Sequence, residues 1–148
     1  MKTKTTDETI AAMLAHIESE CTAIDREALF DRMLDECYSF ESIGGPFAYM
    51  TPSYVLKECD PTGYRCGVND WADGEGWVEI NGSNYQGEEA EKARDEFIED
   101  LESELSDLET ELEEAEAEED PSLAYVRTLT SQVTELQERI AACHKHAL

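Results

Sequence analysis

Two runs of apolar residues at heptad spacing constrain the fold of this chain more than any other feature. Each run advances by alternating steps of three and four residues, which is typical of a helix that buries one stripe against a neighbour. An Asp-Pro pair at residues 120 and 121 separates the runs and can end one helix and start the next. We therefore predict an antiparallel helical hairpin, although the stripes could also pair between chains in a homodimeric four-helix bundle. The first run comprises Ile98, Leu101, Leu105, Leu108, Leu112 and Ala115, and the second Val126, Leu129, Val133, Leu136, Ile140 and Cys143.

The N-terminal residues predict two further helices. Residues 5–24 carry apolar side chains at helical spacing, and Thr5 and Glu8 match a capping box at the start. A second helix should follow with Asp25 as its N-cap. The sequence "SIGGPFAYM" then interrupts the pattern, because Gly-Gly-Pro cannot continue a helix.

The central residues predict short elements. Thr51-Pro52 and Asp60-Pro61 are suitable starts for two short helices, and "WVEINGSNYQ" alternates around Asn81-Gly82 as a β-hairpin does. We predict a mainly α (α+β) fold. It should consist of a small globular α+β unit over residues 1–86 and an acidic antiparallel coiled-coil hairpin over residues 87–148.

The charge of the chain limits its partners. Its formal net charge is -25, from 36 acidic and 11 basic side chains. Such a charge repels nucleic acid and anionic membranes and attracts basic proteins. The N-terminal "MKTKTTDETI" has no signal-peptide core, and no apolar run approaches transmembrane length. We expect a soluble, cytoplasmic protein whose five cysteines, none in a CxxC pair, are unpaired and mostly buried.

The first helix of the predicted hairpin concentrates this charge. Residues 88–120 contain 18 Asp or Glu and 2 Lys or Arg, which is about one carboxylate per 3 Å of helix axis. Duplex DNA carries one charge per about 1.7 Å. In an ordinary coiled coil the acidic flanking positions would face Lys or Arg, but the second helix offers Thr130, Gln132, Gln137 and Arg139 there. The acidic charge is therefore not used in ion pairs within the hairpin.

Three hypotheses account for this helix. Its carboxylates could replace phosphates in the basic groove of a nucleic-acid-binding protein. They could instead form a solvated face that keeps a coiled-coil scaffold or adaptor soluble. A third possibility is recognition of another basic protein, such as a histone-like or chaperone-client surface. The candidate partner-binding residues are Glu99, Asp100, Glu102, Glu104, Asp107, Glu109, Glu111, Glu113, Glu114 and Glu116.

Other kinds of site have little support in the sequence. The acidic, glycine-rich residues 69–79 fail the EF-hand pattern in both registers, and the cysteines and histidines lack zinc-finger spacing. No catalytic fingerprint is present, so we expect no metal, no cofactor and no enzymatic activity. Residues 44–77 are rich in aromatic side chains and should form the small globular core, although they could also expose a contact patch. Those aromatic residues are Phe47, Tyr49, Tyr54, Tyr64, Trp71 and Trp77.

The segment "TPSYVLKECDPTGYRCGVNDWADGEGW" resembles a segment of small uncharacterised proteins of bacteriophages and other mobile elements. It covers under a fifth of the chain and carries no known chemistry. Together with the acidity, the resemblance implies an inhibitor of host defence in the bacterial cytoplasm, similar to anti-CRISPR and anti-restriction proteins, several of which are DNA mimics. No motif of one such family matches residue by residue, so the resemblance assigns no site.

Overall fold

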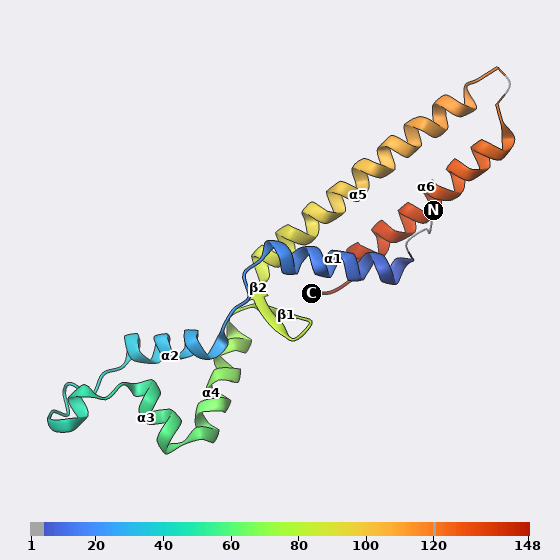
Figure 1. Cartoon of the computed structure of the whole chain (residues 1–148). Coiled ribbons are helices and arrows are strands. Elements are labelled where there is room, and N and C mark those ends of the chain that lie inside the picture. Colours follow the sequence, from blue (N-terminus) through green and yellow to red (C-terminus); the bar gives the residue numbers. More distant parts are fainter. Residues whose placement is uncertain (1–4, 120) are drawn as a thin grey trace. The chain divides into compact units, whose positions relative to one another are not determined.

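A computed structural model describes residues 5–119 and 121–148 of the chain. These residues form a mainly helical fold with a single short β-hairpin in the described part, which confirms the predicted fold class (Figure 1). In chain order the elements are α1 (Thr6–Glu20), α2 (Arg26–Cys37), the 3-10 helix η1 (Gly45–Tyr49), α3 (Pro52–Cys59), α4 (Pro61–Gly74), β1 (Trp77–Ile80), β2 (Ser83–Gln86), α5 (Gly87–Glu116) and α6 (Leu123–Lys145).

The chain divides into two compact units. The helical unit contains α1, α5 and α6, and the small unit, Ala23–Gly87, contains the elements from α2 to β2. The small unit ends at Gly87, one residue after the boundary predicted at residue 86. The same prediction placed residues 5–24 in the N-terminal unit, whereas in the structure α1 packs on α6 and belongs to the helical unit.

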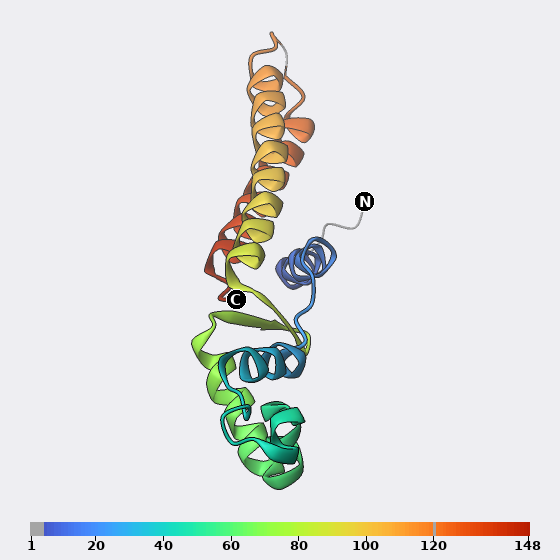
Figure 2. The ribbon, with the colours of Figure 1, turned by 90° about the vertical axis from the view of Figure 1, so that its left-hand side faces the viewer.

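In the helical unit, α5 and α6 form an antiparallel hairpin, as their heptad stripes predict (Figures 1 and 2). The stripe residues Ile98, Leu129 and Leu136 are almost fully buried. The predicted turn residue Asp120 lies outside the described residues. Helix α6 begins at Leu123, after the N-cap Ser122, which makes no side-chain capping bond.

Helix α1 is capped by side chains at its N-terminus and packs against α6. Its predicted capping box is present: the Glu8 N–H donates to Thr5 Oγ1 over 3.3 Å, and the Thr5 N–H donates to Glu8 Oε2 over 2.8 Å. Met13, Ile17 and Thr9 are fully buried on one face of the helix. Arg139 of α6 donates from Nε to Thr9 Oγ1 over 2.7 Å. This bond joins positions 130 residues apart in the sequence and ties α1 to the hairpin.

The small unit packs around three buried side chains, Phe30, Tyr64 and Val68. The rings of Phe30 and Tyr64 meet edge to face, 5.5 Å between centroids. At the hairpin, Asn81 and Gly82 both have positive φ, 50° and 84°, as a two-residue type I′ turn requires. Strands β1 and β2 pair antiparallel on either side of this turn.

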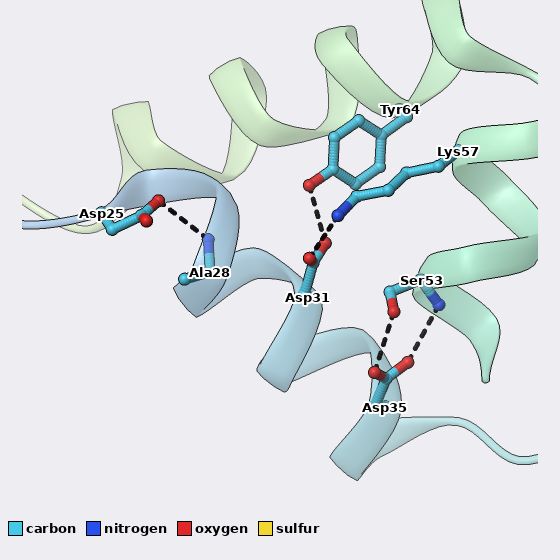
Figure 3. Close-up of polar contacts among 7 residues, drawn as sticks. All are labelled: Asp25, Ala28, Asp31, Asp35, Ser53, Lys57 and Tyr64. Carbon is cyan, nitrogen blue, oxygen red and sulfur yellow. Dashed lines mark hydrogen bonds and ion pairs between the residues drawn. The ribbon is translucent and has the colours of Figure 1, made fainter.

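Aspartates of α2 join it to the neighbouring helices (Figure 3). Asp31 accepts a hydrogen bond from the Tyr64 hydroxyl over 2.6 Å and forms an ion pair with Lys57. Burial, followed by the bond to Asp31, raises the pKa of Tyr64 to about 12. The raised pKa therefore extends to more alkaline pH the range in which Tyr64 is protonated and donates to Asp31.

Asp35 supplies the cap of α3 that the sequence assigns to Thr51. The Thr51 side chain makes no capping bond. Instead, both carboxylate oxygens of Asp35 accept from Ser53: one from its N–H at 2.9 Å and the other from its hydroxyl at 2.8 Å (Figure 3). Ser53 is buried, so these donors need a partner within the protein.

Replacing Asp35 by alanine should destabilise the small unit by about 1–2 kcal/mol, because two donors of Ser53 lose their acceptor. Asp35→Asn keeps one acceptor oxygen and should cost less. Both tryptophans, Trp71 and Trp77, lie in the small unit, so urea unfolding followed by tryptophan fluorescence reports on this unit. Equal urea midpoints for the wild type and Asp35→Ala would show that the cap contributes nothing.

The structure corrects two expectations about side-chain burial. Phe47, Tyr49 and Tyr54, expected in the core, are 52%, 91% and 58% exposed. The unpaired cysteines were expected to be mostly buried. Only Cys143 is buried, whereas Cys21 is half-buried and the others, Cys37, Cys59 and Cys66, are exposed.

Candidate functional site

All ten carboxylates predicted to bind a partner lie on α5 and are exposed. Helix α5 is continuous over 30 residues, so it is roughly 45 Å long. Its buried positions from Ile98 to Ala115 follow the heptad stripe, and acidic residues occupy most of the exposed positions. The continuous helical backbone therefore fixes the spacing of the carboxylates along α5.

The ten carboxylates form two rows along α5. Successive residues of an α-helix are rotated by 100° about its axis. On this basis five of the carboxylates lie on one flank of the apolar stripe and five on the other, with Ser103 and Thr110 between the two rows. Neighbours within the more regular row are three or four residues apart, which is about 5 Å along the axis. This row contains Asp100, Glu104, Asp107, Glu111 and Glu114, and the other contains Glu99, Glu102, Glu109, Glu113 and Glu116.

Three of these carboxylates contact α6. Glu102 lies 3.5 Å from His144 Nε2, the Gln137 side-chain amide donates to Glu109 over 3.3 Å, and the Tyr125 hydroxyl donates to Glu111. From Glu102 to Glu109 is seven residues forward, and from His144 to Gln137 is seven residues back. One heptad of α5 therefore pairs with one heptad of α6 in antiparallel order. Hydrogen bonding to Glu111 raises the pKa of Tyr125.

The basic side chains of the helical unit are engaged elsewhere or lie outside the two rows. Arg139, the basic residue among the four flanking positions of α6, donates to Thr9 of α1. On α5, Lys92 pairs with Glu96 at 3.6 Å and Arg94 with Asp95 at 3.1 Å, both before the first of the ten carboxylates. Within residues 5–119 and 121–148, no Lys or Arg forms an ion pair with any of the ten.

Helix α6 contrasts with α5 in its chemistry. Residues 123–145 contain two carboxylates, Glu135 and Glu138, against three Lys or Arg residues. Thr130, Ser131 and Thr134 line a shallow depression on its outer surface. The charge of the hairpin is thus concentrated on α5, and the hairpin has one strongly acidic face.

Two features of the structure were not predicted from the sequence: the contacts of α6 side chains with the acidic helix, and the exposure of the aromatic residues after α2. His144 and Tyr125 were not predicted to contact the acidic helix; the antiparallel register that pairs Glu109 with Gln137 could have found the contact of His144 with Glu102, but it does not place Tyr125 opposite Glu111. The aromatic residues after α2 were expected mainly in the core, although several of them are exposed.

The described residues lack both a clustered metal site and a membrane-spanning helix. These residues contain no group of three or more His, Cys, Asp or Glu side chains placed to hold a metal ion. None of the helices in the described part of the chain is long and apolar enough to span a membrane.

No protein-family model, curated protein or solved structure matches this chain.

Proposed function

We propose that this chain inhibits a nucleic-acid-binding protein by occupying its basic groove, with α5 in place of nucleic-acid phosphates. The observation that carries the proposal is the pair of exposed carboxylate rows on α5, which no Lys or Arg in the described residues neutralises. Binding is stoichiometric and involves no catalysis. The resemblance to phage proteins suggests a host defence complex, either a CRISPR effector or a restriction enzyme, as the target.

The like charges along α5 repel one another, and this repulsion costs folding free energy. Carboxylates three or four residues apart on a helix repel each other by a few tenths of a kcal/mol per pair. The more regular row alone contains four such neighbouring pairs, between Asp100 and Glu114. Solubility requires far less charge than this. A basic groove would relieve the repulsion on binding, because its Lys and Arg side chains supply the missing counter-charges.

A coiled-coil adaptor is the alternative, and one observation favours it. Leu105, Leu108 and Leu112 are only half-buried, whereas Ile98 and Leu101 are buried. The distal hairpin therefore retains apolar surface that a partner helix or a second copy of the chain could cover. Such an interface would depend mainly on apolar burial and would respond little to salt.

Affinity capture tests the proposal. The immobilised chain should retain nucleic-acid-binding proteins from a bacterial lysate, and an excess of short duplex DNA or single-stranded RNA should release them. The control bait is a four-glutamine variant, in which glutamine replaces Glu99, Glu104, Glu113 and Glu114. It should retain much less of the same proteins. Retention that saturating nucleic acid leaves unchanged would contradict mimicry and favour the adaptor.

A further inference from the structure

A second surface with different chemistry lies in the small unit. Between α2 and the first turn of α3, six large apolar side chains are exposed, and Tyr49 is the most exposed of them at 91%. We call this segment, residues 38–54, the aromatic loop. Its exposed side chains are Tyr38, Ile43, Phe47, Tyr49, Met50 and Tyr54.

The aromatic loop is held closed at its base. Asp35, just before the loop, accepts two hydrogen bonds from Ser53 near its other end, at 2.9 and 2.8 Å (Figure 3). Gly44 and Gly45 have φ of 74° and 59°, a conformation that glycine adopts without strain, and they turn the chain into η1. A surface loop whose ends are joined in this way presents its side chains from a fixed base.

The composition of the loop is typical of a protein interface. Residues 38–54 contain one charged residue, Glu41, although 32% of the whole chain is charged. Interface centres are enriched in Tyr, Phe and Met and depleted of Lys, Glu and Asp. Binding loops that combine Tyr with Ser and Gly, as this loop does, are characteristic of antibody paratopes.

Charge selects the occupant of the loop. Residues 31–60 carry six carboxylates and two cations, and one of those cations, Lys57, pairs with Asp31. A second copy of the chain would bring another net charge of -25 to this surface, so repulsion disfavours self-association. Guanidinium groups stack on the faces of Tyr and Phe and are also attracted to the surrounding carboxylates. We infer that the aromatic loop binds an arginine-rich surface of a partner protein.

This inference goes beyond nucleic-acid mimicry and does not require it. The two surfaces lie in different units and bind by different means: the acidic rows by charge, and the loop by aromatic stacking. Each can therefore be removed without altering the other.

Arginine and lysine peptides test the assignment. We would titrate the full chain with deca-arginine and with deca-lysine and measure affinity by calorimetry. Phe47→Ala/Tyr49→Ala should weaken deca-arginine binding about fivefold or more and deca-lysine binding by less than about twofold. The control, Leu123→Ala, removes an exposed apolar side chain from the helical unit that contacts none of the ten carboxylates among the described residues, and it should leave both affinities nearly unchanged.

NMR, self-association and the α5 variant distinguish binding at the aromatic loop from the alternatives. Amide NMR signals of residues 43–54 should shift on addition of deca-arginine, which tests the wild type even if the double variant unfolds. Equal deca-arginine affinity of the wild type and the loop variant, or no shift in these signals, would overturn the inference. Self-association of the wild type that the loop variant abolishes would assign the loop to a second copy instead. The four-glutamine variant of α5 should weaken both peptides alike, so failure of the α5 proposal is distinguishable from failure of this one.

Discussion

Replacing Leu136 by aspartate should unfold the helical unit. Leu136 is 2% exposed and occupies the α6 stripe that faces α5. The substitution removes a packed side chain and buries an unpaired charge, and together these effects cost about 4–5 kcal/mol or more. That is most of the stability of a typical domain. Far-UV circular dichroism at room temperature should show a large loss of helical signal, because α1, α5 and α6 supply most of the helical residues.

Two further leucine-to-aspartate variants serve as comparisons for the destabilisation by Leu136→Asp. Leu123→Asp makes the same chemical change on α6, but Leu123 is 70% exposed, so the melting temperature should hardly change. Leu105→Asp, on the half-buried part of the α5 stripe, should lie between them, at a cost of several kcal/mol when the leucine faces α6. A Leu136→Asp chain that melts with the wild type would show that the stripes do not pack as described.

The four-glutamine variant should separate inhibition from folding. Glu99, Glu104, Glu113 and Glu114 are exposed and make no hydrogen bond or ion pair with α6 among the described residues. Glutamine keeps helix propensity and shape, and it removes like-charge repulsion, so the melting temperature should equal or exceed that of the wild type. Affinity for the basic partner should fall about tenfold or more, mainly through slower association.

A second set of four substitutions controls for net charge. Glu27, Glu58, Glu75 and Glu79 are exposed in the small unit, and replacing them by glutamine changes the net charge equally. This control variant should lose less than about threefold in affinity, because its carboxylates lie outside the two rows. Equal losses in both variants would mean that overall charge, and not the rows on α5, attracts the partner. Full affinity in the α5 variant would leave its carboxylates as a solvated face.

The hairpin could be predicted because its signal is local. A strict heptad stripe specifies which face of a helix is buried, and the Asp-Pro pair in the sequence between the two stripes signals that a second helix follows. The exposure of Glu99 to Glu116 follows from the same stripe, since these residues occupy the positions it leaves out. The capping residues Thr5 and Asp25 were also predictable, because a cap bonds to a backbone N–H three residues away.

The placement of α1 could not be predicted in the same way. The helix buries Thr9, Met13 and Ile17 on one face. Such an apolar face indicates that the helix packs against another element, but it does not specify which one. The contact that joins it to α6, from Arg139 to Thr9, links two residues with no local relation. A boundary drawn from the change in composition at residue 87 therefore assigned α1 to the wrong unit.

The aromatic residues show the limit of composition as a guide to burial. Large aromatic side chains are usually buried, so Phe47, Tyr49 and Tyr54 were assigned to the core. Phe30, Tyr64 and Val68, with the residues packed on them, already form that core. The Asp35–Ser53 cap closes the loop at its base and leaves its aromatic side chains on the surface.

The salt dependence of partner binding tests the central claim most directly. With the captured partner purified, its affinity for the wild-type chain would be measured between about 50 and 200 mM monovalent salt, the range over which phosphate contacts weaken steeply. If the rows of α5 replace phosphates, affinity should fall at least tenfold across this range, and the slope should be shallower for the four-glutamine variant. An affinity that changes less than about twofold, with the same slope in both proteins, would contradict nucleic-acid mimicry.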